Sequence, residues 1–105
     1  MKKILEYNKI CAIMRNIPLE KTLDYAEAVY RGGVRMFEVA MNSDSAVRQI
    51  EIMRERFGGQ VYVGAGTVTT PERCRMAWEA GAQFFLTPSA TVGTMEFCRK
   101  YDIPL

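Results

Sequence analysis

The sequence predicts an α/β fold that corresponds to about the first four βα units of a (β/α)8 (TIM) barrel. One phrase, a helix end followed by glycine and a short apolar strand, recurs in "AVYRGGVRMFEV", "RERFGGQVYVGA" and "AWEAGAQFFLTP". The glycine steps are about 22 to 26 residues apart, which is room for one short strand, one short helix and tight connections. Because strands and helices alternate strictly, the sheet should be parallel with right-handed crossovers.

Four short and nearly continuous apolar segments are the candidate strands. Parallel strands that are covered by helices have this composition, because both of their faces are buried. The predicted strands are residues 10–14, 36–39, 61–65 and 84–86.

Helices are indicated by apolar residues that recur with the helical period. Pro18 suits a first helical turn, Thr70 and Pro71 form an N-cap followed by proline, and Asp44 is a candidate cap. Each recurring glycine fits the left-handed position that commonly ends a helix. The two apolar stripes are Leu19, Leu23, Ala26 and Tyr30, and Ala46, Ile50, Met53 and Phe57.

An open doubly wound sheet and part of a (β/α)8 barrel both satisfy this alternation. A complete barrel needs about 200 to 250 residues, so the 105 residues of this chain make roughly half of one. Residues 102–105 look like the opening of a fifth strand, with nothing after them to complete or cover it. This ending favours the barrel and predicts that residues 1–105 are the amino-terminal half of a single, truncated (β/α)8 domain.

Charge and hydropathy exclude several classes of partner. The formal net charge is only +2 and the basic residues are dispersed, so no nucleic-acid partner is expected. No apolar run approaches the roughly 20 residues needed to cross a bilayer, so no membrane partner is expected. Glu6, Asn8 and Lys9 interrupt what would have to be the apolar stretch of a signal peptide. We therefore predict a cytoplasmic protein.

The inventory of metal-binding and nucleophilic side chains is small. The chain has three cysteines, no CxxC pair and no histidine. A cysteine–histidine metal site and a histidine-based catalytic triad are therefore excluded within these residues. The sequence predicts neither a metal nor another cofactor.

Polar residues and glycines gather in the segments that follow the predicted strands. In both candidate architectures, chemistry collects at the carboxyl ends of parallel strands and in the loops after them. The loops at the other end of the sheet, which lead from a helix into the next strand, carry mostly turn residues. This asymmetry favours a ligand site at the carboxyl ends of the strands. The segments concerned are residues 15–16, 40–43, 64–69 and 87–89.

Glu38 is a carboxylate inside an otherwise apolar strand. Because side chains alternate along a strand, Phe37 and Val39 should face the helices while Glu38 faces the barrel interior. Partial burial there would raise the pKa of the carboxyl group towards a range useful for acid–base chemistry. The alternative is a glutamate that is paired with a nearby arginine such as Arg35.

Three further residues at the strand ends are candidates for ligand binding. Arg15 suits bidentate binding of a carboxylate or phosphate, although a surface arginine without a ligand explains the position equally well. Thr67 adds a hydroxyl to "VGAGTVTTPE", which is neither a Walker A loop nor a complete G-x-G-x-x-G motif and is otherwise a glycine-rich turn. Pro88 in "FFLTPSA" lines the next strand end or simply begins a helix.

The segments "AIMR", "GVRMFEVAMNS", "VGAGTV" and "GAQFFLTPSA", in this order, give the chain a family resemblance. It resembles the 2-keto-3-deoxy-6-phosphogluconate aldolases, a family that includes 4-hydroxy-2-oxoglutarate and 2-keto-3-deoxy-6-phosphogalactonate aldolases. The resemblance implies a homotrimeric class I aldolase of the Entner–Doudoroff type. Such an enzyme forms a Schiff base with a lysine and cleaves a keto acid phosphate, or 4-hydroxy-2-oxoglutarate, into pyruvate and an aldehyde without a cofactor.

The resemblance also implies roles for individual residues. Glu38 matches the catalytic glutamate that moves protons through a water, and Thr67 matches the threonine that holds the pyruvyl carboxylate or that water. Arg15 matches an arginine of the substrate pocket and Pro88 a wall of the pocket. Asn42 stands where the phosphogluconate enzymes commonly bind the substrate carboxylate with arginine. The phosphogalactonate enzymes tend to have Asn-Ser here, so phosphogalactonate cleavage is an alternative.

The Schiff-base lysine of the family lies in a K-x-F-P context on strand six, which this sequence does not contain. We expect none of its lysines to sit beside Glu38, so the 105-residue chain alone is predicted to be inactive. A phosphosugar isomerase or epimerase that uses Glu38 as its base is a second hypothesis. A non-catalytic half-barrel that self-associates is a third. The lysines are Lys2, Lys3, Lys9, Lys21 and Lys100.

Overall fold

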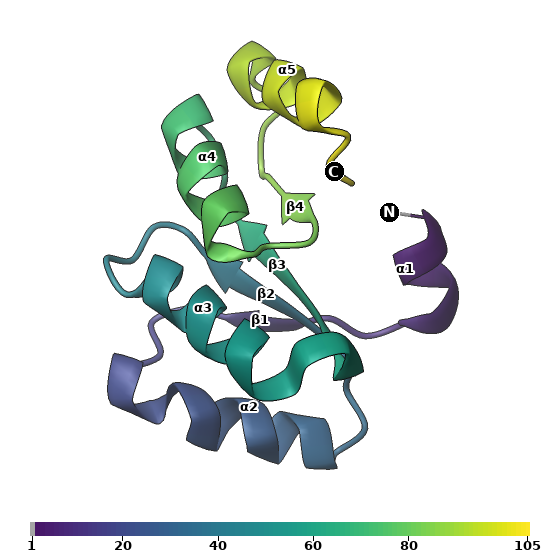
Figure 1. Ribbon diagram of the computed structural model, residues 1–105, viewed down its shortest axis with the longest axis vertical. Coiled ribbons are helices and arrows are strands. Elements are labelled where there is room, and N and C mark those ends of the chain that lie inside the picture. The colour runs from purple at the N-terminus through teal and green to yellow at the C-terminus, as the bar shows by residue number, and fades with distance from the viewer. Residues whose placement is uncertain (1) are drawn as a thin grey trace.

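The computed structural model describes residues 2–105 and contains a parallel sheet of four strands (Figure 1). The strands are hydrogen-bonded in sequence order, and every neighbouring pair is parallel. They are β1 (Ala12–Met14), β2 (Met36–Ala40), β3 (Tyr62–Gly66) and β4 (Phe85–Leu86).

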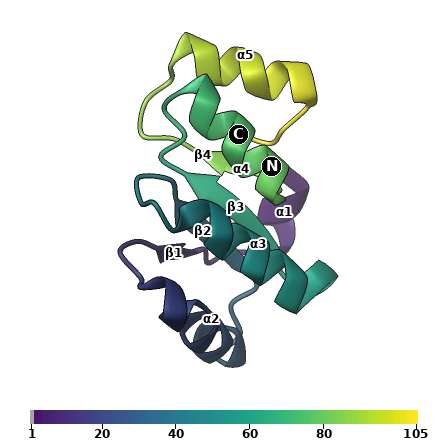
Figure 2. The same cartoon turned by 60° about the vertical axis from the view of Figure 1, so that its left-hand side comes forward.

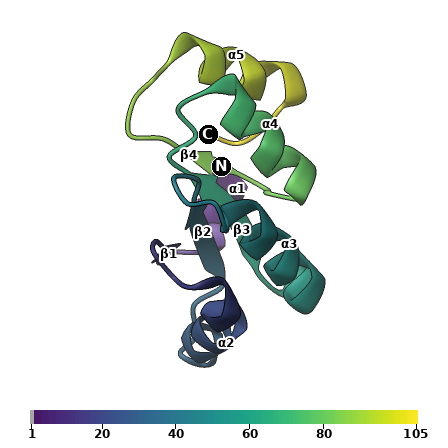
Figure 3. The same cartoon turned by 90° about the vertical axis from the view of Figure 1, so that its left-hand side faces the viewer.

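Helices α2 to α5 follow one another along the sheet in the same order as the strands, whereas α1 lies apart from them (Figures 1 and 3). This arrangement matches consecutive units of a (β/α)8 barrel, as predicted. An open doubly wound sheet is excluded, because its strand order reverses at a switch point. The helices are α1 (Lys2–Tyr7), α2 (Thr22–Arg31), α3 (Ala46–Phe57), α4 (Pro71–Ala80) and α5 (Val92–Tyr101), with 3-10 turns η1 (Leu19–Lys21) and η2 (Gly58–Gln60).

The strands occupy the predicted places, with small changes at their ends. The first strand begins at Ala12 rather than at residue 10, and Ile10 is 66% exposed. An edge strand has a hydrogen-bonded neighbour on one side only, so its ends pair less readily. Figure 2 shows the four strands in order, from β1 at one edge to β4 at the other.

Residues 103–105 lie beside the outer edge of β4. The Phe85 amide donates a hydrogen bond to the Pro104 carbonyl at 2.8 Å, which is the contact that a further strand would make. Asp102 ends α5 in the left-handed conformation, with φ 54°, as Gly81 does at the end of α4, whereas Gly32 and Gly58 end α2 and α3 in other conformations. The prediction that residues 102–105 open a fifth strand agrees with this geometry.

The main core lies between the sheet and the helices. Phe37 of β2 is fully buried and stacks on Phe57 of α3, with ring centroids 6.3 Å apart. The predicted stripe on α3 is confirmed, since all four of its residues are buried. The stripe before it is only partly correct, because Leu19 lies in η1 and is 40% exposed.

Helix starts were predicted less well than helix periods. Pro18 precedes η1 instead of lying in the first turn of α2. Asp44 is not a cap, because α3 begins after Ser45 and no side chain accepts a capping hydrogen bond there. Helix α1 was not predicted from the sequence. The cap at Thr70 is confirmed, because its hydroxyl accepts a hydrogen bond from the Arg73 amide at 3.1 Å.

Thr70→Ala is expected to lower the free energy of unfolding by about 1 kcal/mol, because the Arg73 amide loses the partner that caps α4. Urea unfolding monitored by circular dichroism measures this loss. Ser45→Ala is the matched control, since Ser45 precedes α3 without making a capping hydrogen bond. A loss of equal size in the control would show that capping is not the cause.

Candidate active site

Glu38 faces away from the helices, as strand alternation predicted. Its neighbours Phe37 and Val39 belong to the core under the helices, and neither is exposed. Glu38 is aligned with Ile13 of β1 and Gly64 of β3, and it is 7% exposed. The carboxylate therefore lies on the inner face of the sheet.

Two glycines of β3 make room for side chains on this inner face. A Cβ atom at Gly66 would overlap the carboxylate of Glu38, and one at Gly64 would overlap the ring of Phe84. A larger residue at either position would have to displace these side chains, because neither site has space for a methyl group. The two glycines of "VGAGTV" therefore have a steric reason beyond that of a flexible turn.

The ends of β1 and β3 are joined beside Glu38. Arg15 follows β1, and its Nη2 donates a hydrogen bond to Thr67 Oγ1 at 3.3 Å. A cavity of about 260 Å³ is lined by both residues together with Glu38 and Pro88. The structure thus brings together four of the five residues that were predicted from the sequence to form the site. Leu86 and Thr87 complete the lining.

Asn42 lies elsewhere. It lines a separate cavity of about 500 Å³ between the loops that follow β2 and β3, where its neighbours include Asp44, Glu72 and Arg73. Strand β2 ends at Ala40, and Asn42 is exposed two residues later. Its predicted contact with a substrate carboxylate therefore stays a prediction.

Burial and charge act in opposite directions on Glu38. Burial raises the pKa of its carboxyl group above the ordinary value, and the positive charge of Arg15 partly opposes this rise. None of the hydrogen bonds among the described side chains involves the carboxylate, which opens instead into the cavity. The raised pKa brings the Glu38 carboxyl group closer to the range useful for acid–base chemistry than an exposed glutamate would be.

Cys11 is a neighbour of Glu38 that sequence reasoning missed. Burial and the negative charge of Glu38 raise the pKa of its thiol to about 11. Strand alternation could have found it, because Cys11 and Ile13 are two residues apart and share a face. At neutral pH the thiol is protonated, so it is no nucleophile here.

Glu38→Gln is expected to flatten the pH dependence of stability. The raised pKa means that the folded chain binds this proton more tightly than the unfolded chain does. This contribution is complete below the unfolded-state pKa and is lost as the pH rises through the folded-state pKa. The variant should therefore gain stability relative to wild type between acid and neutral pH, which urea unfolding from pH 4 to 8 measures. Exposed Glu79→Gln is the control, and an equal gain there would contradict the assignment.

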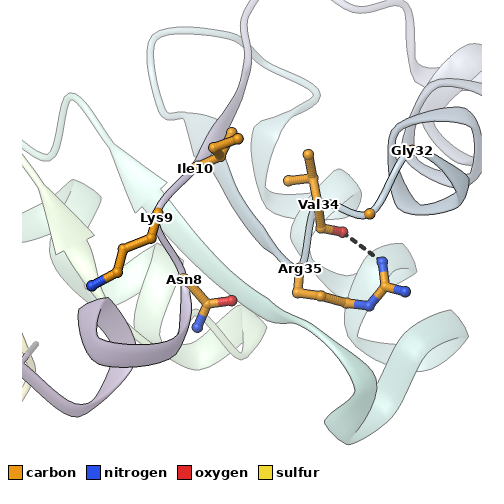
Figure 4. A pocket seen from close by; sticks show the side chains of 7 residues that line it. Asn8, Lys9, Ile10, Gly32, Val34 and Arg35 are labelled. Atoms are coloured by element: carbon orange, nitrogen blue, oxygen red, sulfur yellow. Dashed lines mark hydrogen bonds between the residues drawn. The ribbon is translucent and has the colours of Figure 1, made fainter.

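A third cavity, of about 200 Å³, lies at the opposite end of the strands (Figure 4). Arg35 lines it, but its Nη1 donates to the carbonyls of Tyr30 at 2.7 Å and Val34 at 3.0 Å. Lys9 also lines this cavity and points away from Arg35. The positively charged groups of Arg35 and Lys9 therefore do not converge on one point of the cavity. Since Arg35 is engaged here, the alternative in which it pairs with Glu38 is excluded.

The described residues provide neither a metal-binding cluster nor a helix that could span a membrane. Among residues 2–105, no three histidine, cysteine, aspartate or glutamate side chains come together in a group that could hold a metal ion. Within the same part of the chain, every helix is too short or too polar to cross a membrane.

Comparison with known proteins identifies the family. The family model described as "KDPG and KHG aldolase" matches residues 1–105. The chain belongs to this aldolase family. It is 31% identical over 104 residues to 2-dehydro-3-deoxy-phosphogluconate aldolase of Dickeya dadantii (strain 3937), covering 99% of this chain and 48% of that protein. It is 36% identical over 87 residues to the KHG/KDPG aldolase of Escherichia coli (strain K12), covering 83% of this chain and 40% of that protein.

Solved KDPG aldolases share the fold as well. The aldolase of Legionella pneumophila, captured with pyruvate as a covalent carbinolamine intermediate, superposes with a TM-score of 0.89 at 29% identity. The match covers 97% of this chain and 49% of that one. The predicted family and fold class are therefore confirmed. The chain spans about half the length of the curated relatives it matches.

Proposed function

We propose that this chain supplies one half of the active site of a class I aldolase, which cleaves 2-keto-3-deoxy-6-phosphogluconate or 4-hydroxy-2-oxoglutarate into pyruvate and an aldehyde. The observation that carries the proposal is the convergence of Glu38, Arg15 and Thr67 on one cavity at the carboxyl ends of β1 to β3. Membership of the KDPG and KHG aldolase family supports it. As the family resemblance implies, we expect a homotrimer in the cytoplasm.

The three side chains can divide the work of this reaction. The guanidinium of Arg15 and the hydroxyl of Thr67 are suited to hold the carboxylate of the keto acid. Glu38 can give a proton, through a water, to the hydroxyl that leaves the carbinolamine as water. When the bond between C3 and C4 breaks, the carboxylate can take the proton of the C4 hydroxyl, and the electron pair passes to the iminium formed with a lysine.

The lysine itself is missing from this arrangement. None of the described residues that line the Glu38 cavity is a lysine. Lys9 lies at the opposite end of the strands, and the other described lysine side chains, Lys3, Lys21 and Lys100, are exposed on helical segments. We therefore expect the 105-residue chain alone to form no Schiff base.

Borohydride trapping tests this expectation. Incubation with pyruvate and borohydride should leave the mass of the 105-residue chain unchanged, and stoichiometric labelling would contradict the proposal. Joining the chain to the carboxyl-terminal half of the Dickeya dadantii relative should give a protein that releases pyruvate from the substrate. Glu38→Gln in that protein should lower kcat by about 10² to 10⁴. A folded fusion that binds pyruvate covalently but cleaves no keto acid would refute the role of this half.

The sugar acid is a separate question. Asn42 stands where arginine is common in phosphogluconate enzymes, so 2-keto-3-deoxy-6-phosphogalactonate is the alternative substrate. The ratio of kcat/KM for the two epimers in the fusion decides between them, and Asn42→Arg should shift this ratio towards the gluconate. An epimerase would show no exchange of pyruvate protons for deuterium, which separates that hypothesis from both aldolases.

Self-association is a second candidate function, favoured by the open edge of the sheet. Ile10 lies just before β1 and is 66% exposed, and Ile13 lies in β1 and is 56% exposed. A second copy could cover these side chains and pair with the edge strand. Light scattering should then report a dimer that Ile13→Lys disrupts, whereas a monomer at high concentration would exclude this function.

A further inference from the structure

Arg73 lies outside the Glu38 cavity but bonds the loop that carries Thr67. Its Nη1 donates a hydrogen bond to the Thr67 carbonyl at 3.2 Å and another to Thr69 Oγ1 at 3.1 Å. Arg73 itself lines the neighbouring cavity with Asn42. The proposed reaction gives it no role.

The backbone of Thr67 needs such support. Its φ angle is 57°, in the left-handed region that residues with a branched side chain rarely adopt. A residue in this region is kept there by the structure around it. The hydrogen bonds made by this loop therefore decide where the Thr67 side chain points.

Three side chains, one in α4, one in α5 and one from the residue just before α5, donate to three successive carbonyls of the loop. Arg73 bonds the carbonyl of Thr67, as described above. Thr94 Oγ1 donates to the Val68 carbonyl at 2.7 Å, and Thr91 Oγ1 donates to the Thr69 carbonyl at 3.3 Å. Of these three side chains, only Arg73 holds the peptide of Thr67 itself.

The contacts continue from Thr67 into the site. Thr67 Oγ1 accepts the hydrogen bond from Arg15. The charge of Arg15 in turn acts on Glu38, where it opposes the effect of burial on the pKa. An unbroken series of neighbours thus leads from Arg73 through Thr67 and Arg15 to Glu38.

We propose that Arg73 is a positioning residue, which keeps the Thr67 hydroxyl on Arg15 and thereby keeps the guanidinium beside Glu38. Arg73 does not line the Glu38 cavity, so it acts there only through Thr67 and Arg15. Its importance for catalysis rests on the proposed aldolase function. The arrangement that it maintains can be measured without any catalysis, so failure of one proposal leaves the other standing.

Arg73→Gln tests the proposal when the Glu38 carboxyl carbon is titrated by NMR. Without the bond to its carbonyl, Thr67 should relax and release Arg15, so the pKa of Glu38 should rise above its wild-type value. The Thr67 φ angle, obtained from three-bond couplings, should become negative. Exposed Arg75→Gln, on the same helix, is the matched control and should change neither quantity.

A folded Arg73→Gln chain with the wild-type Glu38 titration and a positive Thr67 φ angle would overturn the proposal. An equal change in Arg75→Gln would also overturn it, because a general loss of positive charge would then be the cause. If Arg73→Gln does not fold, Arg73→Met provides the same comparison, since methionine keeps a long side chain but has no group that could donate a hydrogen bond to the Thr67 carbonyl. An unchanged Glu38 titration with a positive Thr67 φ angle, or an equal change in Arg75→Gln, would again overturn the proposal.

Discussion

Gly66→Ala is expected to displace the Glu38 carboxylate and to destabilise the chain by about 1 to 3 kcal/mol, the usual cost of overpacking. The new methyl group would overlap the carboxylate, which fills the space that Gly66 leaves on the inner face of the sheet. Glu38 would have to turn towards solvent, and its pKa should fall back towards the ordinary value. Urea unfolding and an NMR titration of the Glu38 carboxyl carbon measure the two effects.

A double-mutant cycle identifies the cause of this loss. In a Glu38→Ala background the space is empty, so Gly66→Ala should cost much less there than in wild type. Gly59→Ala is the control, because a methyl group at Gly59 would meet open space and should change stability by less than about 0.5 kcal/mol. Equal costs of Gly66→Ala in the two backgrounds would mean that the carboxylate does not occupy this space.

The position of Glu38 could be predicted from the sequence without knowledge of this steric fit. Strand alternation fixes the face on which a side chain lies, and the ends of parallel strands fix which loops meet. Those two rules were enough to bring Glu38, Arg15, Thr67 and Pro88 to one cavity. Neither rule contains a distance, so the fit between Gly66 and the carboxylate appears only in the structure.

The features that sequence reasoning missed depend on contacts that the pattern of residue types does not show, or on the exact residue at which a helix begins or a strand ends. Asp44 has the residue type of a helix cap, but the helix begins one residue later and uses no capping side chain. Arg73 looks like one of several basic residues on a helix, and only its contacts with Thr67 and Thr69 distinguish it. Asn42 is close to Glu38 in sequence and lines a different cavity, because the chain leaves the sheet after Ala40.

The half-barrel should depend strongly on a few aromatic side chains in its main core. Phe37→Ala is expected to reduce the free energy of unfolding by about 3 to 5 kcal/mol, because the side chain is fully buried and its removal leaves a cavity. The loss is large beside the roughly 5 to 15 kcal/mol that stabilise a typical domain. Urea unfolding measures it, and the amide spectrum shows whether the variant still folds.

The Phe37 prediction also separates the core from the site. Phe37 and Glu38 are adjacent in β2 but face opposite sides of the sheet, so their replacements should act differently. Phe37→Ala should lower stability to a similar extent at every pH, whereas Glu38→Gln should change mainly the pH dependence. Tyr101→Ala is the aromatic control, because Tyr101 is 44% exposed and should cost much less. A loss below about 1 kcal/mol for Phe37→Ala would contradict the packing of β2 against α3, and with it the orientation that places Glu38 in the cavity.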